Sequence, residues 1–256
     1  MNSAVTTSIS DGIAEITISN PGARNAIDAH MAQELVTACD EIDADPSIGV
    51  AIVRGADGYF CSGGSRDELA AISKAPVSDA GVALLQTIYD AFLRVGRLKV
   101  PTIAAIRGGA VGAGVNLAMA TDVRIISDTA RFISGFVNIG IHPGGGHYSL
   151  LSRSAGPQVA AALGVLGDSI SGAQAVTFGL AYLAVDDESV DDEARRLAVV
   201  SGRDPAMARA AIASLRSETE TPAVSWDAAV AMERGVQAWS FARKRAGAWS
   251  ERARAD

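Results

Sequence analysis

The sequence contains few cysteines, no excess of positive charge and no long apolar segment. Its two cysteines, Cys39 and Cys61, offer neither a disulfide framework nor the spacing of a zinc site. The net charge of -7 argues against nucleic-acid binding, because phosphate backbones require basic patches. The chain lacks the roughly 18 uninterrupted apolar residues of a membrane span, and its first residues lack a signal-peptide pattern. We therefore expect a cytoplasmic protein without a metal site that binds neither nucleic acid nor membranes.

What the chain does contain is enough apolar material for a large core. It has 256 residues, of which 48% are hydrophobic, and no low-complexity linker divides it. Alternating apolar residues from Ile9 to Ile18 around Asp11-Gly12 predict a strand pair. Short β-branched segments alternate with helical patterns further along, and alanine-rich helical sequence dominates the end. These patterns predict an α/β core over residues 1–195 and a helical region over residues 196–256.

Two segments share the same predicted order of elements, in which a buried strand is followed by a glycine turn and then by a helix. The first is the strand at 49–55 with the turn at 58–65, where Ser65 and Glu68 have capping-box spacing. The second is the strand at 102–106 with the turn at 108–114. A helix begins with N–H groups that have no intrahelical partner, and glycine lets a ligand approach the backbone. The two turns could therefore aim backbone amides at one negatively charged atom.

Four motifs in this order resemble the crotonase (enoyl-CoA hydratase/isomerase) family. They are residues 20–27 (NPGARNAI), 60–64 (FCSGG), 108–122 (the second glycine turn and its helix) and 140–144 (GIHPG). The resemblance implies a spiral of β-β-α units with C-terminal helices that form trimer contacts. It also implies that the protein is a homotrimer or hexamer and that its ligand is an acyl-CoA thioester, with no other cofactor.

The resemblance also implies roles for particular residues. The backbone N–H groups of Ser62 and Ala113 would bind the thioester oxygen. The residues implied in CoA binding are Arg24, Ser62, Gly63, Gly64, Ala113 and Gly144. Each of two hydrogen-bond donors directed at the oxygen of a developing enolate typically raises the reaction rate by about 10² to 10³-fold.

The proton chemistry departs from the family pattern. Asn116 and Phe136 occupy the positions where the hydratase motif has glutamates, and neither residue can act as a base. No Asp or Glu occurs between Asp90 and Asp122, so a shifted alignment does not restore the first carboxylate. His142 and, with a weaker case, His147 are the remaining acid–base candidates.

Three functions therefore remain open. The first is an enoyl-CoA hydratase/isomerase-like protein that stabilises a thioester enolate but has weak ordinary hydratase activity. The second is a binding protein that holds a fatty acyl-CoA without turning it over. The third is a decarboxylase or carbon–carbon bond hydrolase of this fold that uses His142. The glycine spacing at 108–114 also resembles a dehydrogenase cofactor loop, but no Tyr-x-x-x-Lys pair follows it, and we reject that reading.

Overall fold

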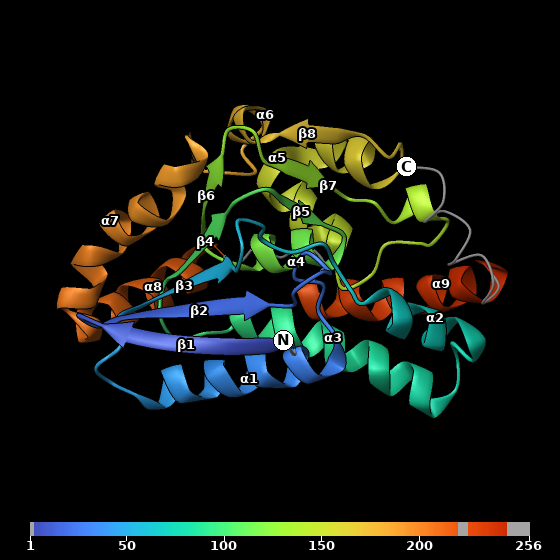
Figure 1. Ribbon diagram of the computed structural model, residues 1–256, viewed down its shortest axis with the longest axis horizontal. Coiled ribbons are helices and arrows are strands. Elements are labelled where there is room, and N and C mark those ends of the chain that lie inside the picture. Colours follow the sequence, from blue (N-terminus) through green and yellow to red (C-terminus); the bar gives the residue numbers. More distant parts are fainter. Residues whose placement is uncertain (1–2, 220–224, 245–256) are drawn as a thin grey trace.

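A six-stranded sheet forms the centre of the computed structural model, which describes residues 3–219 and 225–244 (Figure 1). Its strand order is β1-β2-β3-β4-β6-β9, and only the β1–β2 pair is antiparallel. The strands are β1 (Ala4–Ser10), β2 (Ile13–Ser19), β3 (Val50–Gly55), β4 (Thr102–Ile106), β6 (Val123–Ser127) and β9 (Leu183–Val185). The predicted strand pair around Asp11-Gly12 is confirmed as the β1–β2 hairpin.

A second sheet has three strands, two of which, β5 and β7, follow strands β4 and β6 of the large sheet along the chain. It consists of β5 (Gly109–Val111), β7 (Arg131–Ile133) and β8 (Ser169–Ser171) in the order β5-β7-β8. β5 and β7 are parallel, and Val111 lies opposite Ile133. This pairing places the residues that follow β7 beside the second glycine turn.

Helices cover both faces of the large sheet, as a mostly parallel sheet requires. On one face Ala51 and Val53 share a core with α1 (Ala29–Ala44), α3 (Asp79–Gly96) and α4 (Ala113–Ala120). On the other face Val50 and Ile52 pack against α7 (Val190–Arg203). The predicted reading of β3 as a strand buried on both faces is therefore confirmed.

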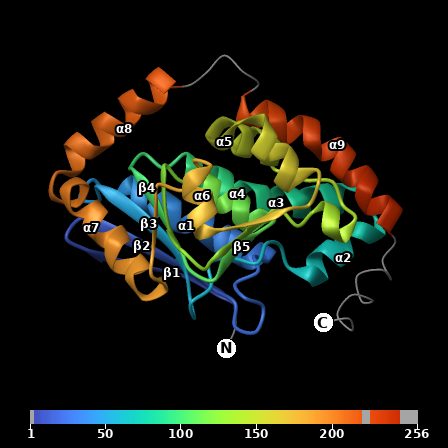
Figure 2. The same cartoon turned by 90° about the horizontal axis from the view of Figure 1, so that it is seen from above.

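The remaining helices surround this core. They are α2 (Arg66–Lys74), α5 (His147–Gly164), α6 (Gly172–Thr177), α8 (Pro205–Thr219) and α9 (Trp226–Lys244), with short 3-10 turns η1 (Val137–Ile139) and η2 (Asp187–Ser189). Figure 2 shows α8 and α9 at opposite sides of the molecule. α9 packs against α2 and α5. Within the described residues, no helix combines the length and apolar character needed to cross a membrane.

One local expectation is corrected by the structure. Ser65 precedes α2 but its side chain makes no capping hydrogen bond, and the Glu68 carboxylate instead accepts the Ala29 N–H at 2.8 Å. Glu68 thus links α2 to the start of α1 rather than closing a capping box. Further along, the left-handed Gly135 separates the three-residue strand β7 from η1.

The division after residue 195 falls within α7. Ala194 and Ala198, on either side of that position, pack against the same face of the sheet, so α7 belongs physically with the core. In the C-terminal stretch expected to mediate trimer contacts, Val230 and Phe241 are buried within the chain, whereas Val236 and Trp239 are exposed. Trp249 lies outside the described residues. The trimerisation role of 196–256 stays a prediction.

Candidate active site

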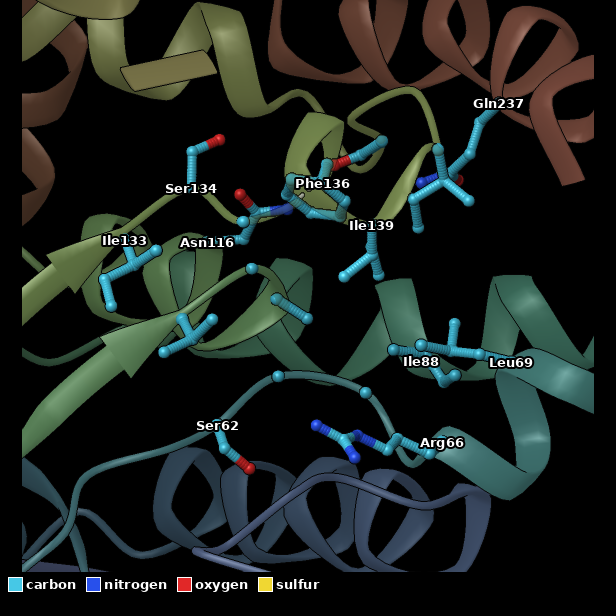
Figure 3. A pocket seen from close by; sticks show the side chains of 18 of the residues that line it. Ser62, Arg66, Leu69, Ile88, Asn116, Ile133, Ser134, Phe136, Ile139 and Gln237 are labelled. Atoms are coloured by element: carbon cyan, nitrogen blue, oxygen red, sulfur yellow. Dashed lines mark hydrogen bonds between the residues drawn. The ribbon is translucent and has the colours of Figure 1, made fainter. Parts of the chain in front are cut away.

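A cavity of about 300 Å³ lies where the two glycine turns, β7 and α9 meet. Its walls are mainly apolar, and the apolar side chains are Leu69, Leu85, Ile88, Tyr89, Phe92, Val111, Ile133, Phe136, Ile139 and Ile141. Figure 3 shows Asn116, Ser134 and Phe136 on one side of the cavity, with Ser62 and Arg66 on the opposite side. None of the described residues that line it is Asp or Glu. The cavity therefore suits an apolar group and offers no carboxylate for proton transfer.

The two glycine turns are joined directly by backbone pairing. The Cys61 N–H donates to the Gly109 carbonyl (3.2 Å), and the Val111 N–H donates to the Cys61 carbonyl (3.0 Å). Position 63 must be glycine, because a Cβ there would lie 2.9 Å from the Val111 oxygen and Gly63 has a φ of +101°. The Ala113 nitrogen lies 3.6 Å from that Cβ position. The two turns thus meet as the sequence predicted.

The available amides differ from the expected pair. The Ser62 N–H donates to the Arg24 carbonyl at 3.0 Å, so in this structure it is already used. Ser65 donates to the Ile27 carbonyl and Ile27 donates to the Gly63 carbonyl, which form a parallel bridge between Ile27 and Gly64. Successive N–H groups of an extended segment point to opposite sides, so the Gly64 N–H points away from Ile27.

Neither the Gly64 N–H nor the Ala113 N–H has an acceptor among the described residues. Ala113 is the first residue of α4 and therefore has no intrahelical acceptor. Both residues line the cavity. We call Gly64 and Ala113 the amide wall.

Arg24 lies outside the cavity lining. Its guanidinium sits 5.6 Å from the centre of the Tyr59 ring, and its backbone φ of +48° is unusual for a residue with a side chain. The neighbouring Asn25 fixes this turn by donating to the carbonyls of Ala56 (2.9 Å) and Tyr59 (2.6 Å). The CoA contact implied for Arg24 stays a prediction.

On the side of the cavity opposite Ser62 and Arg66, three buried side chains are linked by consecutive hydrogen bonds. Ser134 Oγ lies 2.6 Å from His147 Nε2, and His147 Nδ1 lies 2.7 Å from Asn116 Oδ1. Asn116 Nδ2 donates to the Gly144 carbonyl at 2.8 Å. Ser134 and Asn116 belong to the residues that line the cavity, whereas His147 does not. We call Ser134, His147 and Asn116 the relay.

Burial keeps the relay histidine neutral. His147 is fully buried, and this burial lowers its pKa to about 3. The ring of Phe136 meets the His147 ring edge to face at 5.0 Å, which covers the imidazole from one side. His147 is therefore an uncharged imidazole at neutral pH.

His142 and His147 lie in different surroundings, and the structure does not test which of them acts as an acid or base. His142 does not appear among the cavity-lining residues; its Nδ1 lies 2.6 Å from the Pro143 carbonyl oxygen and its ring contacts Tyr148. His147, judged the weaker candidate, is bonded to Asn116 and Ser134. The sequence reasoning missed Ser134 altogether, since a lone serine after a strand carries no signal.

Helix α9 fixes the turn that precedes α5. The Glu233 carboxylate accepts the N–H groups of Gly146 (2.8 Å), His147 (3.1 Å) and Tyr148 (3.3 Å). Burial raises the pKa of Glu233, although the three N–H donors oppose that effect. The Gln237 side chain donates to the His142 carbonyl at 3.1 Å. A Cβ at position 144 would lie 2.2 Å from Gln237 Oε1 and 2.3 Å from the Tyr89 hydroxyl, so a larger residue there would displace these two side chains.

Arg66 contributes the cavity's charge. Its side chain is exposed, and Figure 3 shows the guanidinium at the edge of the cavity beside Ser62. Within the described ranges, no group of three His, Cys, Asp or Glu side chains could hold a metal ion. The site thus combines unpaired backbone donors, an apolar space, one cation and a neutral relay.

Comparison with known proteins supplies independent findings. The family model for enoyl-CoA hydratase/isomerase matches residues 8–246. Probable enoyl-CoA hydratase EchA14 of Mycobacterium tuberculosis is 40% identical over 180 residues, which cover 70% of this chain and 69% of that protein. The 1,2-epoxyphenylacetyl-CoA isomerase of Escherichia coli is 30% identical over 190 residues, covering 74% and 72%. The crystal structure of an enoyl-CoA hydratase from Bacillus halodurans matches with a TM-score of 0.84 at 24% identity, covering 95% of this chain and 99% of that one, and shows the same fold.

Proposed function

The chain belongs to the enoyl-CoA hydratase/isomerase family, and from that premise we propose that it binds an acyl-CoA thioester and stabilises the thioester enolate. Membership confirms the resemblance and the crotonase-type α/β fold that the sequence predicted. The names of both relatives describe CoA thioesters, an enoyl-CoA and an epoxyphenylacetyl-CoA. These names support a CoA thioester as substrate or ligand, and we propose no other cofactor.

The amide wall is the observation that carries this proposal. Unpaired N–H groups beside an apolar cavity are suited to an oxygen that gains negative charge while its acyl group is buried. We assign the two donors to Gly64 and Ala113, in place of Ser62, because the Ser62 N–H is bonded to the Arg24 carbonyl. Ser62 then shapes the turn through its side chain, which donates to the Ala23 carbonyl at 2.7 Å.

Position 64 allows a matched test of this assignment. A Cβ there would meet only the Leu69 side chain, at 3.7 Å or more, so Gly64→Ala keeps both the space and the N–H. Gly64→Pro removes the N–H. Calorimetry with butyryl-CoA should show affinity near that of the unmodified protein for Gly64→Ala and about tenfold weaker for Gly64→Pro, from one lost hydrogen bond of about 1.4 kcal/mol. Equal binding by both variants would refute the Gly64 assignment, and no binding by the unmodified protein would refute acyl-CoA binding.

Ordinary hydratase activity is proposed to be weak. Hydration requires one group that activates water and one that protonates carbon, and Asn116 and Phe136 supply neither. A non-catalytic acyl-CoA-binding role is the second candidate, supported by the carboxylate-free lining. The decarboxylase or hydrolase that would use His142 has less support, because His142 bonds the Pro143 carbonyl outside the lining.

We also propose self-association as a trimer or hexamer. Val236 is 45% and Trp239 is 57% exposed on α9, so part of the apolar surface of this helix is accessible to solvent. Light scattering at micromolar concentration should give a mass of three or six chains, and a monomer would contradict the proposal.

A further inference from the structure

We propose that the site decarboxylates a CoA thioester whose acyl group carries a carboxylate on the α-carbon, and that it does so without a protein base. This inference rests on the proposed binding of acyl-CoA and names a substrate class for the proposed enolate. The carboxylate leaves as carbon dioxide, so the enolate forms without the removal of a proton from carbon.

Two side chains lie next to the Ala113 N–H, where the α-carbon of a bound thioester would be. Asn116 follows Ala113 by three positions on α4, and residues three apart occupy the same face of a helix. The Phe136 ring reaches the turn before that helix, since its Cζ would lie 3.8 Å from a Cβ at position 112. Both side chains belong to residues that line the cavity. The α-carbon adjoins the thioester carbonyl, so a thioester held at the amide wall places its α-carbon near an amide and an aromatic ring.

Neither of these groups can take a proton from the α-carbon. A phenyl ring and a carboxamide are not bases. The Asn116 side chain is also held in place, because its Nδ2 donates to the Gly144 carbonyl and its Oδ1 lies 2.7 Å from His147 Nδ1. An enolate can nevertheless form here from a substrate that loses carbon dioxide, because that step needs a stabilised oxygen and no base.

The surroundings also favour the direction in which charge moves during decarboxylation. In the substrate the negative charge is on the carboxylate, beside a Phe136 ring that donates no hydrogen bond and excludes water. In the transition state the charge moves to the thioester oxygen, where the N–H groups of Gly64 and Ala113 can donate to it. The site therefore binds the transition state more strongly than the substrate, which is the condition for catalysis.

An acidic residue at position 116 or 136 would oppose this reaction. A protein carboxylate beside the α-carbon would repel the carboxylate of the substrate. The charged side chain among the described residues that line the cavity is that of Arg66, which is positive. The replacement of both family glutamates by Asn116 and Phe136 is thus the change that an α-carboxyacyl substrate requires.

The rest of the cavity indicates what else the acyl group carries. Leu85 and Ile88 of α3 and Ile139 of η1 line it, and its volume is about 300 Å³. An alkyl group on the α-carbon would be buried against these apolar side chains. Ethylmalonyl-CoA, which is butyryl-CoA with a carboxylate on the α-carbon, has such a group and is the probe for the test.

The reaction balances with water as the co-reactant. The bond between the α-carbon and the carboxylate carbon breaks, and its electron pair forms the enolate while carbon dioxide leaves. The thioester oxygen carries the negative charge at the amide wall. Water then protonates the α-carbon, and the hydroxide that remains combines with carbon dioxide. The products are butyryl-CoA and bicarbonate.

The test uses the full chain and ethylmalonyl-CoA in deuterium oxide. The unmodified protein should form butyryl-CoA with a single deuterium on the α-carbon, measured by chromatography and mass spectrometry. Butyryl-CoA supplied directly should exchange its α-hydrogens at least about 10²-fold more slowly, because that exchange requires a base. His142→Ala should decarboxylate at the unmodified rate, because His142 lies outside the cavity lining.

Two pairs of variants test the two ends of the reacting group. Phe136→Glu places a carboxylate near the α-carbon, and Phe136→Gln places a neutral group of the same shape there. Decarboxylation should be slower in Phe136→Glu than in Phe136→Gln by about tenfold or more. Gly64→Pro lacks an N–H that Gly64→Ala keeps, and its rate should be lower than that of Gly64→Ala by about 10² to 10³. Circular dichroism of each variant separates a lost rate from a lost fold.

The outcomes separate this inference from the proposed function. Binding of butyryl-CoA without decarboxylation of ethylmalonyl-CoA would overturn this inference alone, and absence of butyryl-CoA binding would overturn acyl-CoA binding itself. Exchange of α-hydrogens as fast as decarboxylation, or loss of activity in His142→Ala, would reveal a protein base and contradict the inference. Equal rates in the two Phe136 variants would contradict it as well, and this pair decides the matter if Gly64→Pro does not fold.

Discussion

The two walls of the cavity use different parts of the chain. The amide wall consists of backbone groups in two glycine turns, held together by pairing between Cys61 and the strand β5. The relay wall consists of side chains from α4, α5 and the segment after β7 that satisfy one another. One wall has donors without partners among the described residues, and the other has polar groups that are already paired.

This difference indicates which properties of the site can change by substitution. Backbone donors depend on the path of the chain, so most side-chain replacements leave them in place. The relay wall depends on residue identity at Asn116, Ser134 and His147. A family member can thus keep its site for the thioester oxygen while its proton chemistry is replaced. The predictions below test that separation.

The largest effect is expected from giving the relay wall the missing carboxylates. Hydration of crotonyl-CoA by the unmodified protein should be slower than by a glutamate-bearing relative by about 10² to 10⁴ for each missing acid–base group. The double variant Asn116→Glu, Phe136→Glu should raise the rate by about 10²-fold or more, measured by steady-state absorbance.

Two controls accompany that measurement. The variant Asn116→Gln, Phe136→Gln has the same shape without the charge and should gain nothing. His142→Ala should leave the rate unchanged, because His142 lies outside the cavity lining. Ordinary hydratase turnover by the unmodified protein, lost in His142→Ala, would show that His142 is the acid–base group.

The next effect concerns the amide wall. Ala113→Pro removes one donor, and proline is tolerated at the first position of a helix, so α4 should persist. Butyryl-CoA should bind about tenfold more weakly, and any reaction that develops an oxyanion should slow by about 10² to 10³. Ala113→Gly keeps the N–H and serves as the control. Undiminished binding and turnover in Ala113→Pro, with unchanged circular dichroism, would exclude this donor.

The smallest effect concerns Glu233 of α9, whose carboxylate accepts the backbone N–H groups of residues 146–148 at the start of α5. The pKa of Glu233 is raised from 4.5 by burial, so the folded state favours its protonated form. This contribution to the free energy of unfolding is fully present below about pH 4.5 and is lost as pH rises through the folded pKa.

Glu233→Gln removes that titration. Urea unfolding of the two proteins from about pH 4 to about pH 7.5 should show that the stability of the unmodified protein, relative to the variant, declines as pH rises. A constant difference would mean that Glu233 has the same pKa in the folded and unfolded states. Gln237→Glu is unsuitable as a control because Gln237 itself lines the cavity.

Local sequence patterns predicted much of the fold. Asp28, an N-cap residue type, caps α1 by accepting the Met31 N–H at 2.8 Å, and Asp45, just before Pro46, is the C-cap of the helix. The β-branched segment of β3 and the two glycine turns lie where the sequence placed them. These features depend on residues within a few positions of one another, and propensity, capping and turn chemistry act over that range.

The sequence by itself also determined that the second glycine turn, α4 and the stretch from β7 to α5 bring no carboxylate to the cavity. No Asp or Glu lies in the segments that form the second glycine turn, α4 or the stretch from β7 to α5, whatever their arrangement. The first glycine turn does contain acidic residues nearby, Asp67 and Glu68, but neither lines the cavity. Absence in sequence is decisive, because folding cannot create a chemical group.

Only the tertiary structure decided which polar groups are free and which are paired. Ser134, His147 and Asn116 are separated by 13 and 31 positions in their two hydrogen bonds, and no local pattern brings them together. The Ser62 N–H is bonded to the Arg24 carbonyl, whereas the N–H of Gly64, two residues on in the cavity lining, has no acceptor among the described residues. The direction of an amide depends on which distant strand its neighbours pair with, and that pairing is a property of the whole fold.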